Sequence, residues 1–244
     1  MAKPRCNISA SFTYRLARVS TLIFGEGACL RLRHEPINAP RHRDASDARP
    51  ADGVHLDRAQ ILGAYAAIEP VVEHERYRRY HDVLTESAAR VAHMLGWPVA
   101  YERATFLANS LPYWQPFPDT NAALERLAAA GYRLGILSNV DDDLLAGTRR
   151  RFTVDFALVI TAQQVRSYKP APPHFLTARE RIGDARWLHA AQSNFHDILP
   201  TNAMGIPNAW INRKHEQPLP GGIPGRELAD MQGLADWLAP QQPK

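Results

Sequence analysis

Apolar and polar residues follow two different periods along this chain of 244 residues. Between Leu56 and Leu111, apolar positions recur every three to four residues, a pattern that predicts helices. Beyond residue 113, short apolar runs alternate with helical stretches, which is typical of a parallel sheet with crossover helices. The expected strands are residues 134–137, 156–160, 187–191 and 209–211.

Helix ends can be placed from glycine, proline and polar residues. In the first half, helices are expected over residues 57–68, 71–80, 82–95 and 104–111, with Pro70 interrupting the first two. In the second half, one helix starts at Asp119 and ends at Gly131, and a last one covers residues 228–238 after a loop over 218–224. An α/β protein with a separate helical part is therefore predicted.

The first 55 residues fit no regular pattern, apart from one strand candidate at residues 20–24. They contain eight Arg and one Lys against five acids, which accounts for the whole net charge of +4. The remainder is neutral, so a broad basic face for nucleic acid is not expected. No apolar run approaches the roughly 20 residues that cross a bilayer. The two cysteines, Cys6 and Cys29, imply no disulfide framework, and a cytoplasmic location is the expectation.

Candidate chemistry gathers at the ends of two expected strands. Ser138-Asn139 follows the strand at 134–137, and Lys169-Pro170 follows the strand at 156–160. In open α/β sheets, ligands bind at the carboxyl ends of the strands. A hydroxyl, an amide and an amine at neighbouring strand ends predict a corner that binds an anion. The alternative for each piece alone is an ordinary polar turn and a surface lysine.

Together these motifs resemble the haloacid dehalogenase superfamily. Its second motif is a strand that ends in Ser-Asn, and its third is Lys-Pro followed by a nearby Phe, here Phe175. Residues 192–197 and 209–213 resemble its L-2-haloacid dehalogenase branch. The resemblance implies an α/β fold with a Rossmannoid parallel sheet and an inserted helical cap. The implied parts are a leader (1–55, with a first core strand at 20–24), a cap (56–112) and a core (113–244).

That branch displaces halide from a 2-haloacid with an aspartate, and water then cleaves the resulting ester. By resemblance, Ser138 and Asn139 would bind the substrate carboxylate or the nucleophile. Lys169 would keep the nucleophile ionised, since a nearby cation lowers the pKa of a carboxyl group. Asn194 and Asp197 would position the water or the lysine. The implied partners are a small-molecule carboxylate substrate and a second copy of the chain in a homodimer.

The cap carries a cluster of phenols and cations at Tyr77, Arg78, Arg79 and Tyr80. It could meet a substrate carboxylate, because guanidinium groups bind carboxylates well. The alternative is a solvated helix face with two aromatic side chains packed beneath it.

The first motif of the superfamily departs from its pattern in this chain. Gly25 stands where the nucleophilic aspartate is expected, so negligible turnover is predicted for this exact sequence. Two explanations stay open: the nucleophile was lost, or the residues before Leu56 come from a shifted reading frame that would restore Phe-Asp-Tyr-Gly-Thr. The alternative functions are a non-catalytic binding protein and a phosphatase-like hydrolase.

A magnesium site is not expected in this chain. Gln192 replaces the first acid of the superfamily's metal motif and leaves only Asp197, whereas Mg²⁺ prefers several anionic oxygens. No cofactor is predicted.

Overall fold

A six-stranded sheet forms the centre of the protein, in the order β3-β2-β1-β4-β5-β6. The computed structural model describes residues 19–24, 58–97 and 99–239. The strands are β1 (Val19–Phe24), β2 (Arg133–Ser138), β3 (Leu158–Thr161), β4 (Trp187–Ala191), β5 (Asn208–Ile211) and β6 (Arg226–Leu228).

The strands other than β1 share one direction. β2 is parallel to β3, and β4, β5 and β6 are parallel to one another. Because β1 runs antiparallel to both β2 and β4, these two groups point the same way. Their carboxyl ends therefore lie at one edge of the sheet, where ligands bind in α/β folds. The predicted α/β class is confirmed.

The direction of β1 differs from the expectation. Val19 pairs with Ser138, whereas Phe24 pairs with Arg133 on one side and Trp187 on the other. The carboxyl end of β1 thus lies at the edge opposite Ser138. Residues 20–24 form a strand as predicted, but its expected parallel direction is wrong, and Gly25 lies outside the described residues. An apolar run reads alike in both directions, so the pattern could not decide this.

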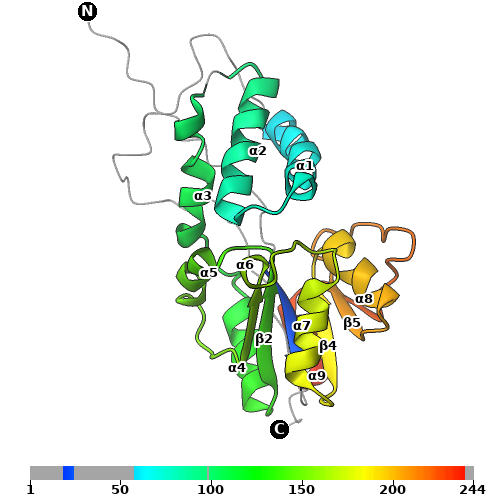
Figure 1. The fold of residues 1–244 in the computed structure, drawn as a ribbon. Coiled ribbons are helices and arrows are strands. Elements are labelled where there is room, and N and C mark those ends of the chain that lie inside the picture. Colours follow the sequence, from blue (N-terminus) through cyan, green and yellow to red (C-terminus); the bar gives the residue numbers. More distant parts are fainter. Residues whose placement is uncertain (1–18, 25–57, 98, 240–244) are drawn as a thin grey trace, which may run out of the picture.

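Helices cover both faces of the sheet and extend beyond its carboxyl edge (Figure 1). They are α1 (Arg58–Glu75), α2 (Tyr80–Met94), α3 (Phe106–Ser110), α4 (Thr120–Ala129), α5 (Asp142–Arg149), α6 (Ala162–Val165), α7 (Pro173–Ile182), α8 (Leu199–Ala203) and α9 (Met231–Leu238). Short 3₁₀-helices occupy Tyr101–Arg103 and Leu111–Tyr113, and a short π-helix occupies Asn194–Ile198. Among the described residues, no helix is both long and apolar enough to cross a membrane.

Two hydrophobic clusters hold helices on the two faces of the sheet. On one face, Leu124 and Leu127 of α4 and Leu234 of α9 pack against β2, β4 and β5. On the other face, Phe175 of α7 packs against Leu137 of β2 and its neighbours in β3. Each fully buried Leu or Phe side chain contributes about 2 kcal/mol of transfer free energy. Packing on both faces explains why β2 is almost uniformly apolar rather than alternating.

Helices α1 to α3 lie over the carboxyl edge of β2 and share a third cluster with it. Val140 and Leu144, which follow β2, pack in this cluster with Val72 of α1 and Leu84 of α2. Figure 1 shows these helices as a group set apart from the sheet.

Several boundaries differ from the sequence prediction: α2 begins at Tyr80 rather than at Asp82, and β3 covers Leu158–Thr161 rather than residues 156–160. α1 continues through Pro70 instead of stopping there. The carbonyl that Pro70 leaves without an N–H belongs to Ala66, an exposed residue, so this interruption is tolerated. In addition, β6 (Arg226–Leu228) precedes α9, which starts at Met231 rather than at Leu228.

Asp141 joins the helical group to the sheet edge. Its carboxylate is fully buried and accepts hydrogen bonds from the backbone N–H groups of Tyr80 (3.0 Å) and His81 (2.9 Å) at the start of α2. Arg79 lies 3.5 Å from the same carboxylate. No side chain of its own segment caps this helix, so the turn after β2 supplies the missing acceptor.

Candidate functional site

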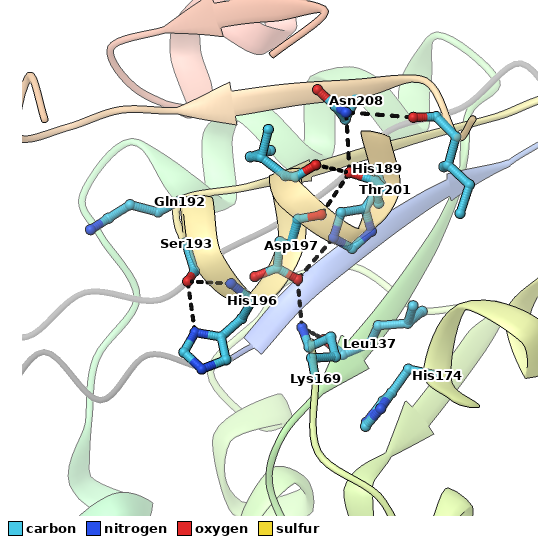
Figure 2. A network of polar contacts seen from close by, with 12 residues as sticks. Leu137, Lys169, His174, His189, Gln192, Ser193, His196, Asp197, Thr201 and Asn208 are labelled. Atoms are coloured by element: carbon cyan, nitrogen blue, oxygen red, sulfur yellow. Dashed lines mark hydrogen bonds and ion pairs between the residues drawn. The ribbon is translucent and has the colours of Figure 1, made fainter. Parts of the chain in front are cut away.

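Lys169 lies at the centre of the carboxyl edge, and its side chain is fully buried. Its Nζ donates to Oδ1 of Asp197 at 2.8 Å and to the backbone carbonyl of Leu137 at 3.1 Å (Figure 2). Leu137 belongs to β2, whereas Asp197 follows β4, so the ammonium links the two halves of the sheet across β1. Charge-assisted hydrogen bonds of this length are among the stronger ones in proteins.

Asn139 fixes the backbone of Lys169. Its Oδ1 accepts from the N–H of Lys169 at 2.7 Å, and its Nδ2 donates to the carbonyl of Lys169 at 3.0 Å. The two predicted motifs therefore meet, but the Asn139 amide holds the protein's own backbone. The neighbouring Ser138 is also buried, and its carbonyl accepts from Nε2 of His174 at 3.0 Å. Substrate binding by Ser138 and Asn139 stays a prediction.

His189 is a member of this site that the sequence did not point to. It lies on β4, and its Nε2 is 3.0 Å from Oδ1 of Asp197, the oxygen that also binds Lys169 (Figure 2). Because a carboxylate accepts, Nε2 carries the proton of the neutral ring. Nδ1 is buried and has no hydrogen-bond partner in the described part of the chain. A single histidine inside an apolar strand has no spacing that would have marked it.

At neutral pH the buried side chains at this edge comprise one ion pair, Lys169 with Asp197, and two neutral imidazole rings, those of His174 and His189. Burial alone would raise the pKa of Asp197, but the Lys169 ammonium and the His189 hydrogen bond bring it well below its ordinary value. Burial, assisted by the charge of Lys169, lowers the pKa of His174 to about 3. Burial also lowers the pKa of His189, against the opposing pull of Asp197. Within this group, the positive charge of Lys169 is balanced by Asp197.

Asn194 has a different environment from the one expected. Its Nδ2 donates to the carbonyl of Gly222 at 2.7 Å, and its Oδ1 accepts from the N–H of Leu219 at 3.1 Å. Both polar atoms of this amide therefore hold the loop before β6 instead of contacting Lys169. A Cβ at Gly222 would collide with Oδ1 of Asn194, so only glycine allows this approach.

His196 points away from Asp197 and toward Ser193. The Ser193 hydroxyl is 2.8 Å from Nδ1 of His196 and also accepts from its backbone N–H at 3.1 Å. Ser193 thereby caps the N-terminus of the short π-helix Asn194–Ile198. The histidine that contacts Asp197 is thus His189 of β4 and not the adjacent His196.

Most of the cap cluster is engaged with the protein itself. Arg78 binds Glu75 at 2.9 Å and Arg79 binds Asp143 at 2.8 Å. The hydroxyl of Tyr80 donates to Glu69 at 3.0 Å, and the ring of Tyr77 packs against that of Tyr168. These contacts favour a structural role, although substrate contact by this cluster stays a prediction.

The residues at this edge do not fit a magnesium ion. Asp197 is bonded to an ammonium group, and Gln192 supplies a neutral amide where a second acid would be needed. A divalent cation beside Lys169 would be repelled, and hard cations need several oxygen ligands. Among the described residues, no group of three His, Cys, Asp or Glu is arranged to hold a metal.

The sequence of this chain is similar to those of known proteins. Residues 21–191 match the family of haloacid dehalogenase-like hydrolases. The (S)-2-haloacid dehalogenase H-109 of Pseudomonas putida is 27% identical over 186 residues, which cover 74% of this chain and 77% of that protein. A haloacid dehalogenase-like hydrolase domain-containing protein 3 of Danio rerio is 30% identical over 134 residues, and this match covers 50% of the chain and 54% of the relative.

The fold has solved counterparts. The L-2-haloacid dehalogenase of Xanthobacter autotrophicus superposes with a TM-score of 0.64 at 18% identity, covering 74% of this chain and 86% of that one. At this identity the likeness concerns the fold alone.

Proposed function

The chain belongs to the haloacid dehalogenase-like hydrolases, and we propose that it is a 2-haloacid dehalogenase-like member whose Lys169 corner serves a small carboxylate substrate. The observation that carries this proposal is the buried Lys169 ammonium, held by Asp197 and the end of β2 at the ligand-binding edge. In the complete reaction, a carboxylate displaces halide from the α-carbon, and water then cleaves the ester. Lys169 would keep that carboxylate ionised, and Asp197 would orient Lys169.

In this exact polypeptide the attacking carboxylate is not supplied by the described residues at the edge. Oδ1 of Asp197 is bonded to both Lys169 and His189. The carboxylate of Asp141 is bonded to the start of α2. Both residues are buried and their carboxylates are engaged inside the protein, so the α-carbon of a substrate has no access to them. We therefore expect negligible turnover from the chain as sequenced.

The test is halide release from 2-chloropropionate by the full-length chain, with Lys169→Ala as the matched variant. The expected rate for both is that of the uncatalysed reaction. Halide release by the unchanged chain that disappears in Lys169→Ala would contradict the inactivity and would support catalysis at this corner.

A non-catalytic binding protein is the second candidate, favoured by the same engaged carboxylates. Calorimetric titration with 2-chloropropionate separates the two. Saturable binding without halide release supports a binding protein, whereas neither binding nor release means that this corner serves another ligand.

The reading-frame hypothesis concerns the same missing acid. The nucleotides that encode residues 20–60 and the intact mass of the natively expressed protein decide it. A shifted frame that supplies Phe-Asp-Tyr-Gly-Thr would return the nucleophile to the proposal, whereas an unchanged frame leaves the inactive form as the natural one.

A further inference from the structure

A cavity of about 260 Å³ is lined by residues from the end of α1 and from the segment that joins α6 to α7. Arg76 and Tyr77 line it from the link after α1, and Arg166 and Tyr168 line it from the opposite side. The side chains of the Lys169 corner do not line this cavity. It is smaller than the roughly 300–1,000 Å³ of sites for drug-sized ligands, which indicates a small molecule.

The two arginines of the cavity differ from their neighbours. Arg78, Arg79 and Arg90 are each bound to carboxylates of the protein. Within the described part of the chain, the guanidinium groups of Arg76 and Arg166 have no acidic partner. Two such cations on one cavity create an attraction for an anion, because guanidinium matches carboxylate in geometry.

The aromatic side of the cavity is formed by tyrosine. The rings of Tyr77 and Tyr168 lie 5.7 Å apart, and the guanidinium of Arg166 lies 5.4 Å from the centre of the Tyr77 ring. The hydroxyl of Tyr77 is buried and has no hydrogen-bond partner among the described residues. Because this hydroxyl is buried, the surfaces that Tyr77 and Tyr168 offer a ligand are their apolar rings.

The backbone of Arg166 adds an independent observation. It closes α6 in the left-handed conformation, with φ of 49°, a place where glycine is usual. A side chain in this conformation costs roughly 1 kcal/mol, and such outliers gather at functional sites. The position therefore carries a guanidinium at some cost in stability.

We propose that this cavity is a binding site for a small organic monoanion with a planar apolar body, such as an aromatic carboxylate, separate from the Lys169 corner. The charges support a single negative group, since two guanidiniums (Arg76 and Arg166) and one carboxylate (the buried Glu73) line the cavity. His74 also lines the cavity, and its Nδ1 donates to the carbonyl of Pro70 at 2.6 Å. The carboxylate of the ligand would lie between the guanidiniums, with its apolar part against the tyrosines.

Calorimetric titration of the full-length chain with benzoate, and with the uncharged benzamide, tests this site. We expect saturable binding of benzoate alone. Arg76→Gln and Arg166→Gln should each weaken it roughly tenfold or more, as expected for the loss of a charge-assisted hydrogen bond. Arg149→Gln, which changes an exposed arginine at the end of α5, is the matched control and should leave the affinity unchanged.

Arg166→Gly separates binding from folding. It removes the guanidinium and also relieves the left-handed backbone, so binding should fall while thermal stability is kept or raised. Three results would overturn the site: no saturable binding of benzoate, equal binding of benzamide, or an affinity that neither arginine substitution changes. None of them depends on whether the chain releases halide.

Discussion

Lys169 and Asp197 form a buried pair whose two members depend on each other. The side chain of Lys169 is fully buried and that of Asp197 is 2% exposed. Removing one partner of such a pair leaves an uncompensated charge in a medium that solvates it poorly. The identity of both residues is therefore constrained by folding as well as by any chemistry at the edge.

Replacement of the lysine tests this dependence. We expect Lys169→Met to lower the free energy of unfolding by roughly 3–5 kcal/mol, because Asp197 would keep only His189 as a partner. Urea denaturation measures the change. The double variant Lys169→Met/Asp197→Asn should be less destabilised than Lys169→Met alone, and equal values for the two would show that the charges are not coupled.

His174 makes the free energy of unfolding depend on pH. Its pKa is about 3 in the folded chain against an ordinary 6.5, so between these values the unfolded chain binds a proton that the folded chain does not. Its contribution is complete above pH 6.5 and is lost as the pH falls toward 3. His174→Gln keeps a donor for the carbonyl of Ser138 but cannot titrate. We expect the slope of unfolding free energy against pH to become shallower by about 1.4 kcal/mol per pH unit between 6 and 4.

Urea denaturation at several pH values gives this slope. His189 stays in the variant and contributes in the same direction, so part of the dependence should remain. An identical slope in His174→Gln would mean that His174 is not held neutral.

At the scale of single residues, the sequence predicted the members of the corner better than their contacts. Lys169, Asn139 and Asp197 meet as their motifs suggested, because strand ends converge at one edge. The partners of Asn194 could not be predicted, since they lie in a loop far along the chain. His189 was missed because its role arises only from the proximity of β4 to the turn that follows it.

At the scale of structural elements, the packing of the loop over residues 217–225 against Asn194 requires glycine at position 222. Gly222 has no unusual φ, so its requirement is steric and comes from Asn194. We expect Gly222→Ala to lower the unfolding free energy by about 1–3 kcal/mol, the usual cost of an overpacked contact. Thermal denaturation measures it. Gly63→Ala is the matched control, because an added Cβ there meets nothing and alanine favours a helix.

A smaller cost for Gly222→Ala in an Asn194→Ser background would assign the effect to this contact. Equal costs in the two backgrounds would instead place the strain in the loop backbone.

The strands and helices could be predicted where a long pattern existed. The strand at 187–191 has the predicted bounds, and those at β2 and β5 differ by a single residue at their ends. β6 was missed because three residues carry too little pattern to be distinguished from a loop. α1 passes Pro70 because tertiary packing overrides local preference.

For the whole molecule, the orientation of β1 decides which end of this strand lies at the sheet edge that contains Lys169. In a chain without its natural cysteines (Cys6→Ser, Cys29→Ser), we expect the pair Phe24→Cys and Arg133→Cys to form a disulfide on mild oxidation. These residues are paired across antiparallel strands, at a Cα separation that a disulfide spans. Gel mobility under non-reducing conditions measures the bond.

The control pair is Phe24→Cys with Ser138→Cys, at opposite ends of the strand pair. A disulfide in the control and none in the first pair would mean that the strand runs parallel to β2. Residue 25 would then follow at the edge that contains Lys169.

The central place of β1 also has a consequence for folding kinetics. Its neighbours β2 and β4 are joined through it, and both lie far from it in sequence, with α1 to α4 between β1 and β2. Closing a loop of that length costs chain entropy before any strand pairing compensates for it. Local pairs such as α1 with α2 carry no such delay. The sheet should therefore be completed late, and the period before β1 inserts is when the unpaired edges of β2 and β4 are most exposed to association with other chains.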